Sequence, residues 1–229
     1  MDDFKLSQRA TEKKNISQGG PHFAPQLMAE HQHAPESELP KGYLLKRPLD
    51  LLLSSLALII LSPVFLLISS LIKLTSPGPV FFRQQRLGVR EKPFMILKFR
   101  SMRTGSEKTG SQFTTTNDSR ITPIGKLIRK TSLDELPQLI NIFRGEMSLI
   151  GPRPYIGFEL KETSPANRVM RSSVRPGISG LAQTSGRSAL SQETVIDYDL
   201  NYVKQCSLTL DFKIVFRTLQ KVIACDGSN

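Results

Sequence analysis

The stretch LLLSSLALIILSPVFLLISSLI, residues 51–72, contains no charged side chain. As one continuous helix it would be about 33 Å long, which matches the hydrocarbon thickness of a bilayer. The alternative is a helix buried inside a soluble protein. A basic chain of 229 residues has little other apolar sequence that could surround such a helix on all sides. The stretch therefore predicts a membrane-associated helix.

A serine-proline pair, Ser62-Pro63, lies in the middle of this stretch. Pro63 cannot donate a hydrogen bond to the carbonyl of Ile59, so we expect a kink there, with the Ser62 hydroxyl helping to satisfy the freed backbone. Basic residues on both flanks favour a re-entrant helix whose two ends face the cytoplasm. Proline also occurs in spanning helices, so a single crossing is the alternative. The flanking residues are Lys41, Lys46, Arg47, Lys73, Arg83, Arg86, Arg90 and Lys92.

The overall composition describes a basic protein with one folded region. The formal net charge is +11 and the isoelectric point is near 9.9, so the chain needs nucleic acid, an acidic membrane surface or phosphate-bearing substrates as a partner. The absence of tryptophan argues against single-strand binding by base stacking. Cys206 and Cys225 lack metal-ligand spacing and are interpreted as reduced thiols. Residues 1–40 are polar and aperiodic, which predicts a disordered tail.

The rest of the chain predicts an α+β fold, mostly helical with one short β-hairpin. Two apolar runs, residues 80–82 and 93–100, are expected to pair around a turn at Gly88. Thr122-Pro123 has the order of a helix cap followed by a first helical residue. Further helices are expected from Ser132 to just before Gly145, over residues 155–161, and over residues 191–223 with a break near Cys206-Ser207.

The segment RKTSLDELPQL, residues 129–139, carries the candidate chemistry. Ser132 followed by Glu135 is the pattern of a capping box, so a structural role for the acidic residues is one interpretation. The other is a diphosphate site, because Asp134 and Glu135 lie among many cations. A carboxylate pair can hold Mg²⁺, and a carboxylate can also attack phosphorus and carry the group covalently. The cations, for which a solvated basic face is the alternative, are Arg120, Lys126, Arg129, Lys130, Arg144 and Arg153.

Five motifs follow one another along the chain: KFRSM (98–102), DSRITPIG (118–125), SLDELPQL (132–139), GEMSLIGPRP (145–154) and RPGISGLAQ (175–183). Together they closely resemble the monotopic phosphoglycosyl transferases, the bacterial sugar transferase family of polyprenyl-phosphate hexose-1-phosphate transferases. The resemblance runs from about Lys46 to Ile223. The form that the chain resembles is the minimal catalytic one, without the extra membrane helices that precede this unit in larger members.

The resemblance implies a two-step exchange. Asp134 would attack the sugar-bearing phosphorus of a nucleotide-diphosphate sugar, usually a UDP-sugar, and release a nucleoside monophosphate. Undecaprenyl phosphate would then take the phosphosugar from Asp134. Glu135 would bind Mg²⁺, with help from Asp134, while Lys98, Arg129 and Arg153 would contact substrate phosphate.

The resemblance also implies where the protein acts. It predicts a re-entrant helix over residues 46–75, broken at Ser62-Pro63, and a catalytic domain with amphipathic interfacial helices over residues 76–223. That domain would lie on the cytoplasmic face of the bacterial inner membrane, against anionic lipid, at the first membrane step of exopolysaccharide, capsule, O-antigen or glycan synthesis. No nucleic-acid partner is expected. The sugar, the polymer and the oligomeric state, a homodimer included, stay open.

Two other functions are compatible with parts of the sequence. A basic, membrane-tethered binding module would explain the charge and the apolar stretch, but not the acidic pair among arginines. A different class of glycosyltransferase would need a glycine-rich nucleotide loop or a DxD motif, and neither stands out. Within the transferase interpretation, direct transfer with a carboxylate acting as general base is the rival mechanism.

Overall fold

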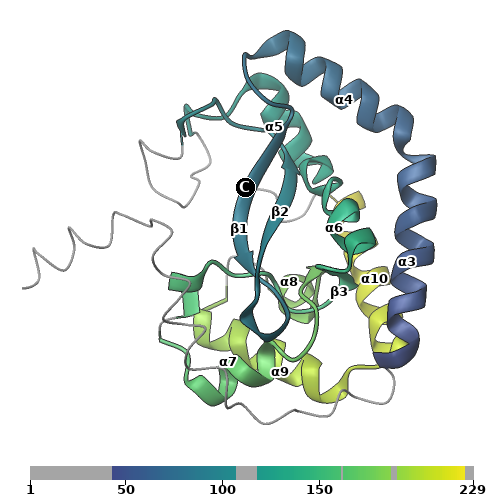
Figure 1. The fold of residues 1–229 in the computed structure, drawn as a ribbon, viewed down its shortest axis with the longest axis vertical. Helices are drawn as coiled ribbons and strands as arrows, with labels where there is room; N and C mark the ends of the chain where they lie inside the picture. Colours follow the sequence, from purple (N-terminus) through teal and green to yellow (C-terminus); the bar gives the residue numbers. More distant parts are fainter. Residues whose placement is uncertain (1–42, 107–117, 161, 187–189, 225–229) are drawn as a thin grey trace, which may run out of the picture. The chain divides into compact units, whose positions relative to one another are not determined.

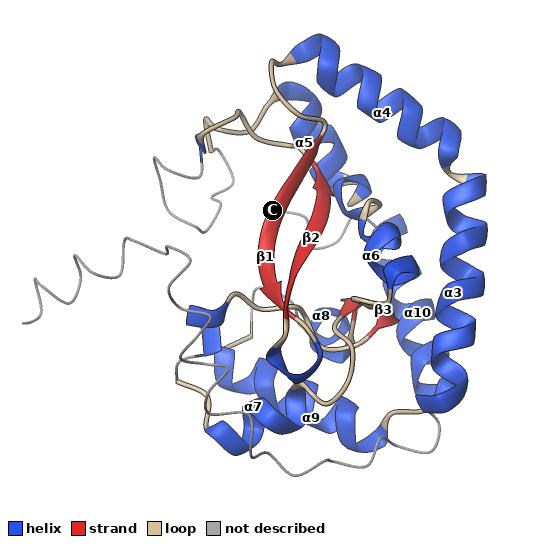
Figure 2. Ribbon diagram, viewed as in Figure 1, coloured by secondary structure: helices blue, strands red, loops and turns tan. Residues whose placement is uncertain are grey.

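The computed structural model describes residues 43–106, 118–160, 162–186 and 190–224, all within one compact unit, Glu36–Asn229. The predicted tail, residues 1–40, lies outside them. The described residues are mostly helical and contain two small sheets, as Figures 1 and 2 show. In chain order the elements are α3 (Tyr43–Ile60), α4 (Ser62–Thr75), β1 (Phe81–Leu87), β2 (Pro93–Phe99), α5 (Pro123–Lys130), α6 (Gln138–Arg144), β3 (Ser148–Ile150), α7 (Pro165–Arg171), β4 (Gly177–Ser179), α8 (Leu181–Ser185), α9 (Gln192–Gln205) and α10 (Leu208–Ile223).

The apolar stretch forms two helices, α3 and α4, with a bend of 60° between them (Figure 1). Pro63 lies in the first turn of α4, and the carbonyl of Ile59 accepts the Ser62 hydroxyl at 2.8 Å in place of the missing N–H. The predicted kink is therefore confirmed. Among the described residues, neither helix alone is long and apolar enough to cross a bilayer. On length and composition the bent pair could form a broken span or a re-entrant loop.

β1 and β2 form the predicted antiparallel hairpin, in which Phe81 lies opposite Phe99. Its turn runs through Gly88, as expected from the sequence, and continues as a short 3-10 turn ending at Glu91. Glu91 has a left-handed backbone, φ 53°, which is uncommon outside glycine. Its buried carboxylate accepts two hydrogen bonds, at 2.7 and 2.9 Å, from Arg168 of α7. The hairpin turn is thus fixed by a long-range ion pair.

Several helices begin at the caps that the sequence indicates. The Thr122 hydroxyl accepts a hydrogen bond from the Gly125 amide at 3.0 Å where α5 begins. The two C-terminal helices, α9 and α10, are separated at Cys206 and Ser207 as predicted. Ser164 caps α7 in the same way, accepting from the Asn167 amide. The pair Ser164-Pro165 was therefore a usable signal for a helix that the sequence analysis missed.

Two expectations for the middle of the chain are not met. The helix expected over residues 155–161 is only a 3-10 turn, Gly157–Leu160, among the described residues. The second sheet was not predicted at all. It pairs β3 with β4 in parallel, Ser148 opposite Gly177 and Ile150 opposite Ser179. A strand of three residues is too short to display an alternating pattern, so hydrophobic periodicity could not reveal it.

The core consists of contiguous apolar clusters that join the helix pair to the rest of the fold. One contains Ile68 and Ile72 of α4, Phe99 of β2 and Ile128 of α5. A second, around Ile142 of α6, includes side chains from α3 and β2. Others lie around β3, α9 and α10, and around the segment that follows β3. The apolar helices are thus part of the folding core on one side, although several of their leucines are exposed on the other.

Polar contacts also attach α3 to α6 and α10. Lys46, only 4% exposed, forms an ion pair with Asp211 of α10. The Arg47 guanidinium donates at 2.6 Å to the carbonyl of Ile142, in the last turn of α6, and at 3.0 Å to that of Phe143. Lys46 and Arg47 were interpreted as charges flanking a membrane segment. In the structure their side chains bind α10 and α6, and these contacts orient α3.

We predict that Pro63→Ala straightens the bend. The substitution restores a backbone donor and removes a ring clash that costs about 3 kcal/mol inside a helix. Spin labels on two exposed residues, Leu52 in α3 and Leu74 in α4, should move apart in pulsed electron-spin distance measurements. The control is Ser62→Ala, which removes the hydroxyl and keeps the proline, and should leave the distance unchanged. An unchanged distance in Pro63→Ala would show that tertiary packing, not proline, sets the bend.

Candidate active site

The acidic pair lies in a tight turn between α5 and α6. Residues Leu133–Glu135 form a single 3-10 turn, and α6 begins only at Gln138. Pro137 has no N–H to donate to the carbonyl of Leu133, so an α-helix cannot run through this segment. The prediction of one helix from Ser132 to Gly145 is therefore wrong at its start, whereas its end at Gly145 is confirmed by a left-handed cap, φ 87°.

The predicted capping box is also absent. Ser132 has a left-handed backbone, φ 57°, and its side chain makes no cap hydrogen bond. The Glu135 carboxylate instead accepts a hydrogen bond through Oε1 from Nζ of Lys98 on β2, at 2.7 Å. The structural interpretation of the acidic pair thus loses its main support.

Apolar and amide anchors hold this turn against the hairpin. Leu133 packs on the cluster around Ile128, and Leu136 packs on two clusters at once. Asn141, fully buried in α6, accepts the Leu97 amide at 2.9 Å and donates to the Met95 carbonyl at 2.8 Å. Asn141 therefore pairs with one amide and one carbonyl of β2, and it holds α6, which follows the acidic turn, beside the strand that carries Lys98.

Two cations and burial together control the charge of Asp134. Burial raises the pKa of its carboxyl to about 6, and the neighbouring Glu135 adds to the rise. Lys98 and, more weakly, Arg129 lower that pKa. Arg129 lies in the last turn of α5 and reaches Asp134 electrostatically. The structure therefore brings together Asp134, Glu135, Lys98 and Arg129, four of the residues singled out from the sequence.

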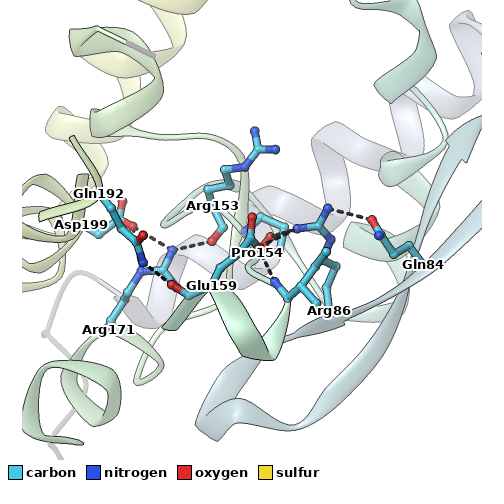
Figure 3. Close-up of polar contacts among 9 residues, drawn as sticks. Gln84, Arg86, Arg153, Pro154, Glu159, Arg171, Gln192 and Asp199 are labelled. Carbon is cyan, nitrogen blue, oxygen red and sulfur yellow. Dashed lines mark hydrogen bonds and ion pairs between the residues drawn. The ribbon is translucent and has the colours of Figure 1, made fainter. Parts of the chain in front are cut away.

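Arg153 is on a separate loop that follows β3. Its side chain is exposed, and Figure 3 shows its guanidinium pointing away from the contacts that hold its backbone. Arg86 of β1 connects the two parts of the site. Burial lowers the pKa of Arg86 to about 10; Glu159 and Glu135 oppose that shift, and Arg153 adds to it. Arg86 thus lies within electrostatic reach of both the acidic turn and Arg153.

Not every cation near the acidic pair in sequence faces it in space. Arg120 forms a bidentate pair with Asp118, in which Nε donates to Oδ1 at 2.8 Å and Nη2 donates to Oδ2 at 2.5 Å, and it holds the pKa of that carboxyl down at about 2. Lys126, Lys130 and Arg144 are exposed. These residues fit the alternative of a solvated basic face.

The donor set is suited to Mg²⁺ only in combination with a phosphorylated ligand. Among the described residues there is no group of three or more histidine, cysteine or acidic side chains that could hold a metal. Mg²⁺ is usually bound by one or two carboxylates together with substrate phosphates and water. Asp134 and Glu135, adjacent in one turn, supply that number of carboxylates.

Comparison with known proteins identifies the family of the chain. The family model described as "Bacterial sugar transferase" matches residues 41–225. The chain belongs to the bacterial sugar transferase family. It is therefore a phosphosugar-transferring enzyme by family, and the acidic turn with its cations is the candidate active site.

Three similar relatives have informative names. The exopolysaccharide production protein ExoY of Sinorhizobium fredii is 42% identical over 82% of this chain and 90% of its own length. The UDP-N-acetylgalactosamine-undecaprenyl-phosphate N-acetylgalactosaminephosphotransferase of Aeromonas hydrophila is 43% identical over 80% of this chain. The UDP-glucose:undecaprenyl-phosphate glucose-1-phosphate transferase of Klebsiella pneumoniae is 43% identical over 77%. The match covers only 45% and 39% of the latter two proteins.

Sequence reasoning missed two residues of the site. Asn141 was overlooked because a single amide in an apolar helix carries no pattern. Arg86 was grouped with the basic flank of the apolar stretch, although it sits in a strand at only 11% side-chain exposure. The strand predicted over residues 80–82 ended too early to include Arg86, because β1 runs from Phe81 to Leu87 through polar residues that show no apolar run.

We predict that Asp134 titrates near pH 6 in the metal-free protein, because burial disfavours its charged form. Carboxyl carbon NMR of aspartate-labelled protein should resolve this midpoint, and Asp134→Asn identifies the signal by removing it. Lys98→Met should move the midpoint upward, since the lysine charge lowers this pKa. A midpoint near 4, the ordinary value for aspartate, would contradict the burial seen here.

Proposed function

We propose that this enzyme transfers a sugar-1-phosphate from a UDP-sugar to undecaprenyl phosphate and releases uridine monophosphate. The observation that carries the proposal is the half-buried Asp134, next to a glutamate that is ion-paired to Lys98. A carboxylate with a pKa near 6 is mostly ionised at neutral pH, and its partly dry surroundings reduce its solvation. The names of the relatives from Aeromonas and Klebsiella support the reaction class and differ in the sugar.

The exchange would occur in two displacements at one phosphorus atom. In the first, a carboxylate oxygen of Asp134 forms a bond to the sugar-bearing phosphorus, and the bond from that phosphorus to the bridging oxygen breaks. The electron pair leaves with uridine monophosphate. In the second, a phosphate oxygen of undecaprenyl phosphate attacks the same phosphorus and the Asp134 carboxylate is released. Both steps use a carboxylate as a nucleophile and leaving group, as in other covalent phosphoryl carriers.

The cations of the site would offset the charge of the diphosphate. Arg129 and Arg153 present planar guanidinium groups suited to phosphate oxygens, and Lys98 supplies a point charge beside Glu135. Mg²⁺ held by Glu135 and Asp134 would neutralise charge on the departing phosphate. The residues that support this assignment lie on β2, α5, the acidic turn and the loop after β3.

The bent helices α3 and α4 would place this site at the cytoplasmic surface of the inner membrane. Their two apolar segments meet at Leu61, and the length and composition of the pair are compatible with a broken span or a re-entrant loop, of which we propose the second. A site at head-group depth is what a lipid-linked phosphate requires, and the net charge of +11 favours anionic lipid. The exposed apolar residues that support this orientation are Leu52, Leu53, Leu56, Ile59, Ile60, Leu66, Leu67 and Leu74.

We predict a covalent intermediate on Asp134. Enzyme mixed with a reactive UDP-sugar in the absence of lipid acceptor should release about one equivalent of uridine monophosphate in a burst. Mass spectrometry should find a phosphosugar on the peptide that contains Asp134, and hydroxylamine should remove it, because an acyl phosphate is a mixed anhydride. Asp134→Asn should abolish the adduct and lower turnover at least about 1,000-fold, since an amide is a poor nucleophile.

The matched control is Glu135→Gln, which should slow adduct formation without moving it to another residue. Direct transfer makes the opposite prediction, with no burst, no adduct and intersecting initial-rate lines. Absence of the adduct under rapid quench, in a preparation that turns over, would reject the covalent mechanism and leave the overall reaction intact.

We also predict that turnover stops in chelator and returns with Mg²⁺. The diphosphate charge must be offset as uridine monophosphate departs. Turnover is measured from released uridine monophosphate, before and after chelation, in wild type and in Glu135→Gln. The variant should need a higher Mg²⁺ concentration for half-maximal rate. Full activity in chelator would refute the role given to Glu135.

A further inference from the structure

The backbone of the loop that carries Arg153 is hydrogen-bonded to several other elements. Gly151, Pro152, Pro154 and Tyr155 are buried, and only Arg153 extends outward. At the start of the loop, the Gly151 amide donates to the Ser179 carbonyl at 2.9 Å, and the Pro152 carbonyl accepts from Gly177 at the same distance. The parallel strand β4 therefore fixes the first half of the loop.

Three donors from other elements hold the second half. The carbonyl of Arg153 accepts a hydrogen bond from Nη2 of Arg171, which lies at the end of α7. The next carbonyl, that of Pro154, accepts from Arg86 of β1 at 3.1 Å. The carbonyl of Tyr155 accepts from the Leu87 amide at 2.9 Å. Figure 3 shows that Arg171 and Arg86 approach the loop from opposite sides.

Arg171 is committed to this position by two further contacts. Its Nε donates at 2.8 Å to Asp199 of α9, which is 1% exposed, and Arg171 itself is 6% exposed. Its guanidinium carbon lies 4.2 Å from the centre of the Tyr155 ring, a cation–π contact. Burial raises the pKa of Asp199 and the Arg171 charge opposes that rise, so the two groups depend on each other.

The charges around the loop leave Arg153 as the outward cation. Asp199 balances Arg171, and Glu159 balances Arg86 at 3.2 Å. The two arginines that contact the loop are therefore each neutralised by a carboxylate, and the pairs exert little net repulsion on the Arg153 guanidinium. Arg171 donates to the backbone carbonyl of Arg153 and to the Asp199 carboxylate, so it holds these two groups at a fixed separation. We call these three residues the Arg171 bracket.

We propose that Arg171 and Asp199 are positioning residues that fix the backbone of Arg153 so that its guanidinium meets the diphosphate of the nucleotide sugar. The inference rests on the proposed function for the identity of the ligand, but not for the rigidity of the loop. Arg171→Lys tests it, because lysine keeps the charge beside Asp199 but cannot form the same fork to Asp199 and to the Arg153 carbonyl. Asp199→Asn is the second variant, which removes the charge and keeps an acceptor.

The same helix provides a matched control. Arg168 lies one turn before Arg171, is 9% exposed, and forms a bidentate pair with Glu91 of the hairpin turn. Arg168→Lys therefore perturbs a buried ion pair of the same type that is directed at another segment. We expect similar losses of thermal stability from Arg168→Lys and Arg171→Lys. A difference in UDP binding between the two variants would therefore arise from the lost contact to Arg153 and not from general destabilisation.

The experiment measures UDP binding with Mg²⁺ by calorimetry on the full chain with Asp134 intact, because UDP carries no sugar to transfer and Asp134 is a proposed Mg²⁺ ligand. Arg171→Lys and Asp199→Asn should weaken UDP binding about 10-fold, and Arg168→Lys less than about twofold. In an Arg153→Ala background, Arg171→Lys should add less than about twofold, because coupled residues are non-additive. Equal losses in Arg168→Lys and Arg171→Lys, or additive losses with Arg153→Ala, would overturn the proposal.

Hydrogen exchange tests the Arg171 bracket without any ligand. The amides of Gly151 and Ile156 are hydrogen-bonded in the native loop, so peptides covering residues 151–156 should lose protection in Arg171→Lys and keep it in Arg168→Lys. Unchanged protection in Arg171→Lys would overturn the positioning role. If wild type binds no UDP while the loop still loosens in Arg171→Lys, the proposed nucleotide is wrong and the positioning of Arg153 stands.

Discussion

Two adjacent carboxylates in a partly dry turn repel each other and lose hydration, so the site depends on how that charge is balanced. The ion pair between Lys98 and Glu135 meets this requirement, and it joins the second strand of the hairpin to the acidic turn. Lys98 also counteracts the burial that raises the pKa of Asp134. Without a cation at this strand position the pKa of Asp134 would be higher, and a smaller fraction of its carboxyl would be ionised to act as a nucleophile.

Lys98 and the acidic turn are held in place by residues that lie outside the site itself. Asn141 uses its side-chain amide to pair with the edge of β2, as an added strand would, and so holds α6 against the hairpin. Pro137 prevents an α-helix from starting earlier, which leaves the acidic residues in a tight turn instead of on a helix face. A continuous helix from Ser132 would have directed Glu135 back to its own cap and away from Lys98.

The apolar helix pair is attached to this machinery by charge as much as by packing. Lys46 is paired with Asp211, whose other oxygen accepts the hydroxyl of Tyr202 at 2.7 Å. Arg100, 5% exposed, donates at 2.7 Å to the backbone and side chain of Ser76 at the end of α4. The start of α3 is therefore bound to α10, and the end of α4 is bound to Arg100, the residue after β2. A change in the angle at Leu61 would strain the ion pair between Lys46 and Asp211 and the hydrogen bonds between Arg100 and Ser76.

The sequence by itself determined the features that arise from neighbouring residues. The apolar run, the proline at its centre, the hairpin around Gly88, the capped start of α5 and the break before α10 all follow from local chemistry. The family resemblance singled out Asp134, Glu135, Lys98, Arg129 and Arg153 as site candidates. Tertiary structure decided which partner each charge takes. Glu135 pairs with a lysine 37 residues away, and Arg171 reaches a carboxylate 28 residues away. Such pairs form only when the chain closes on itself, so no local period or propensity encodes them.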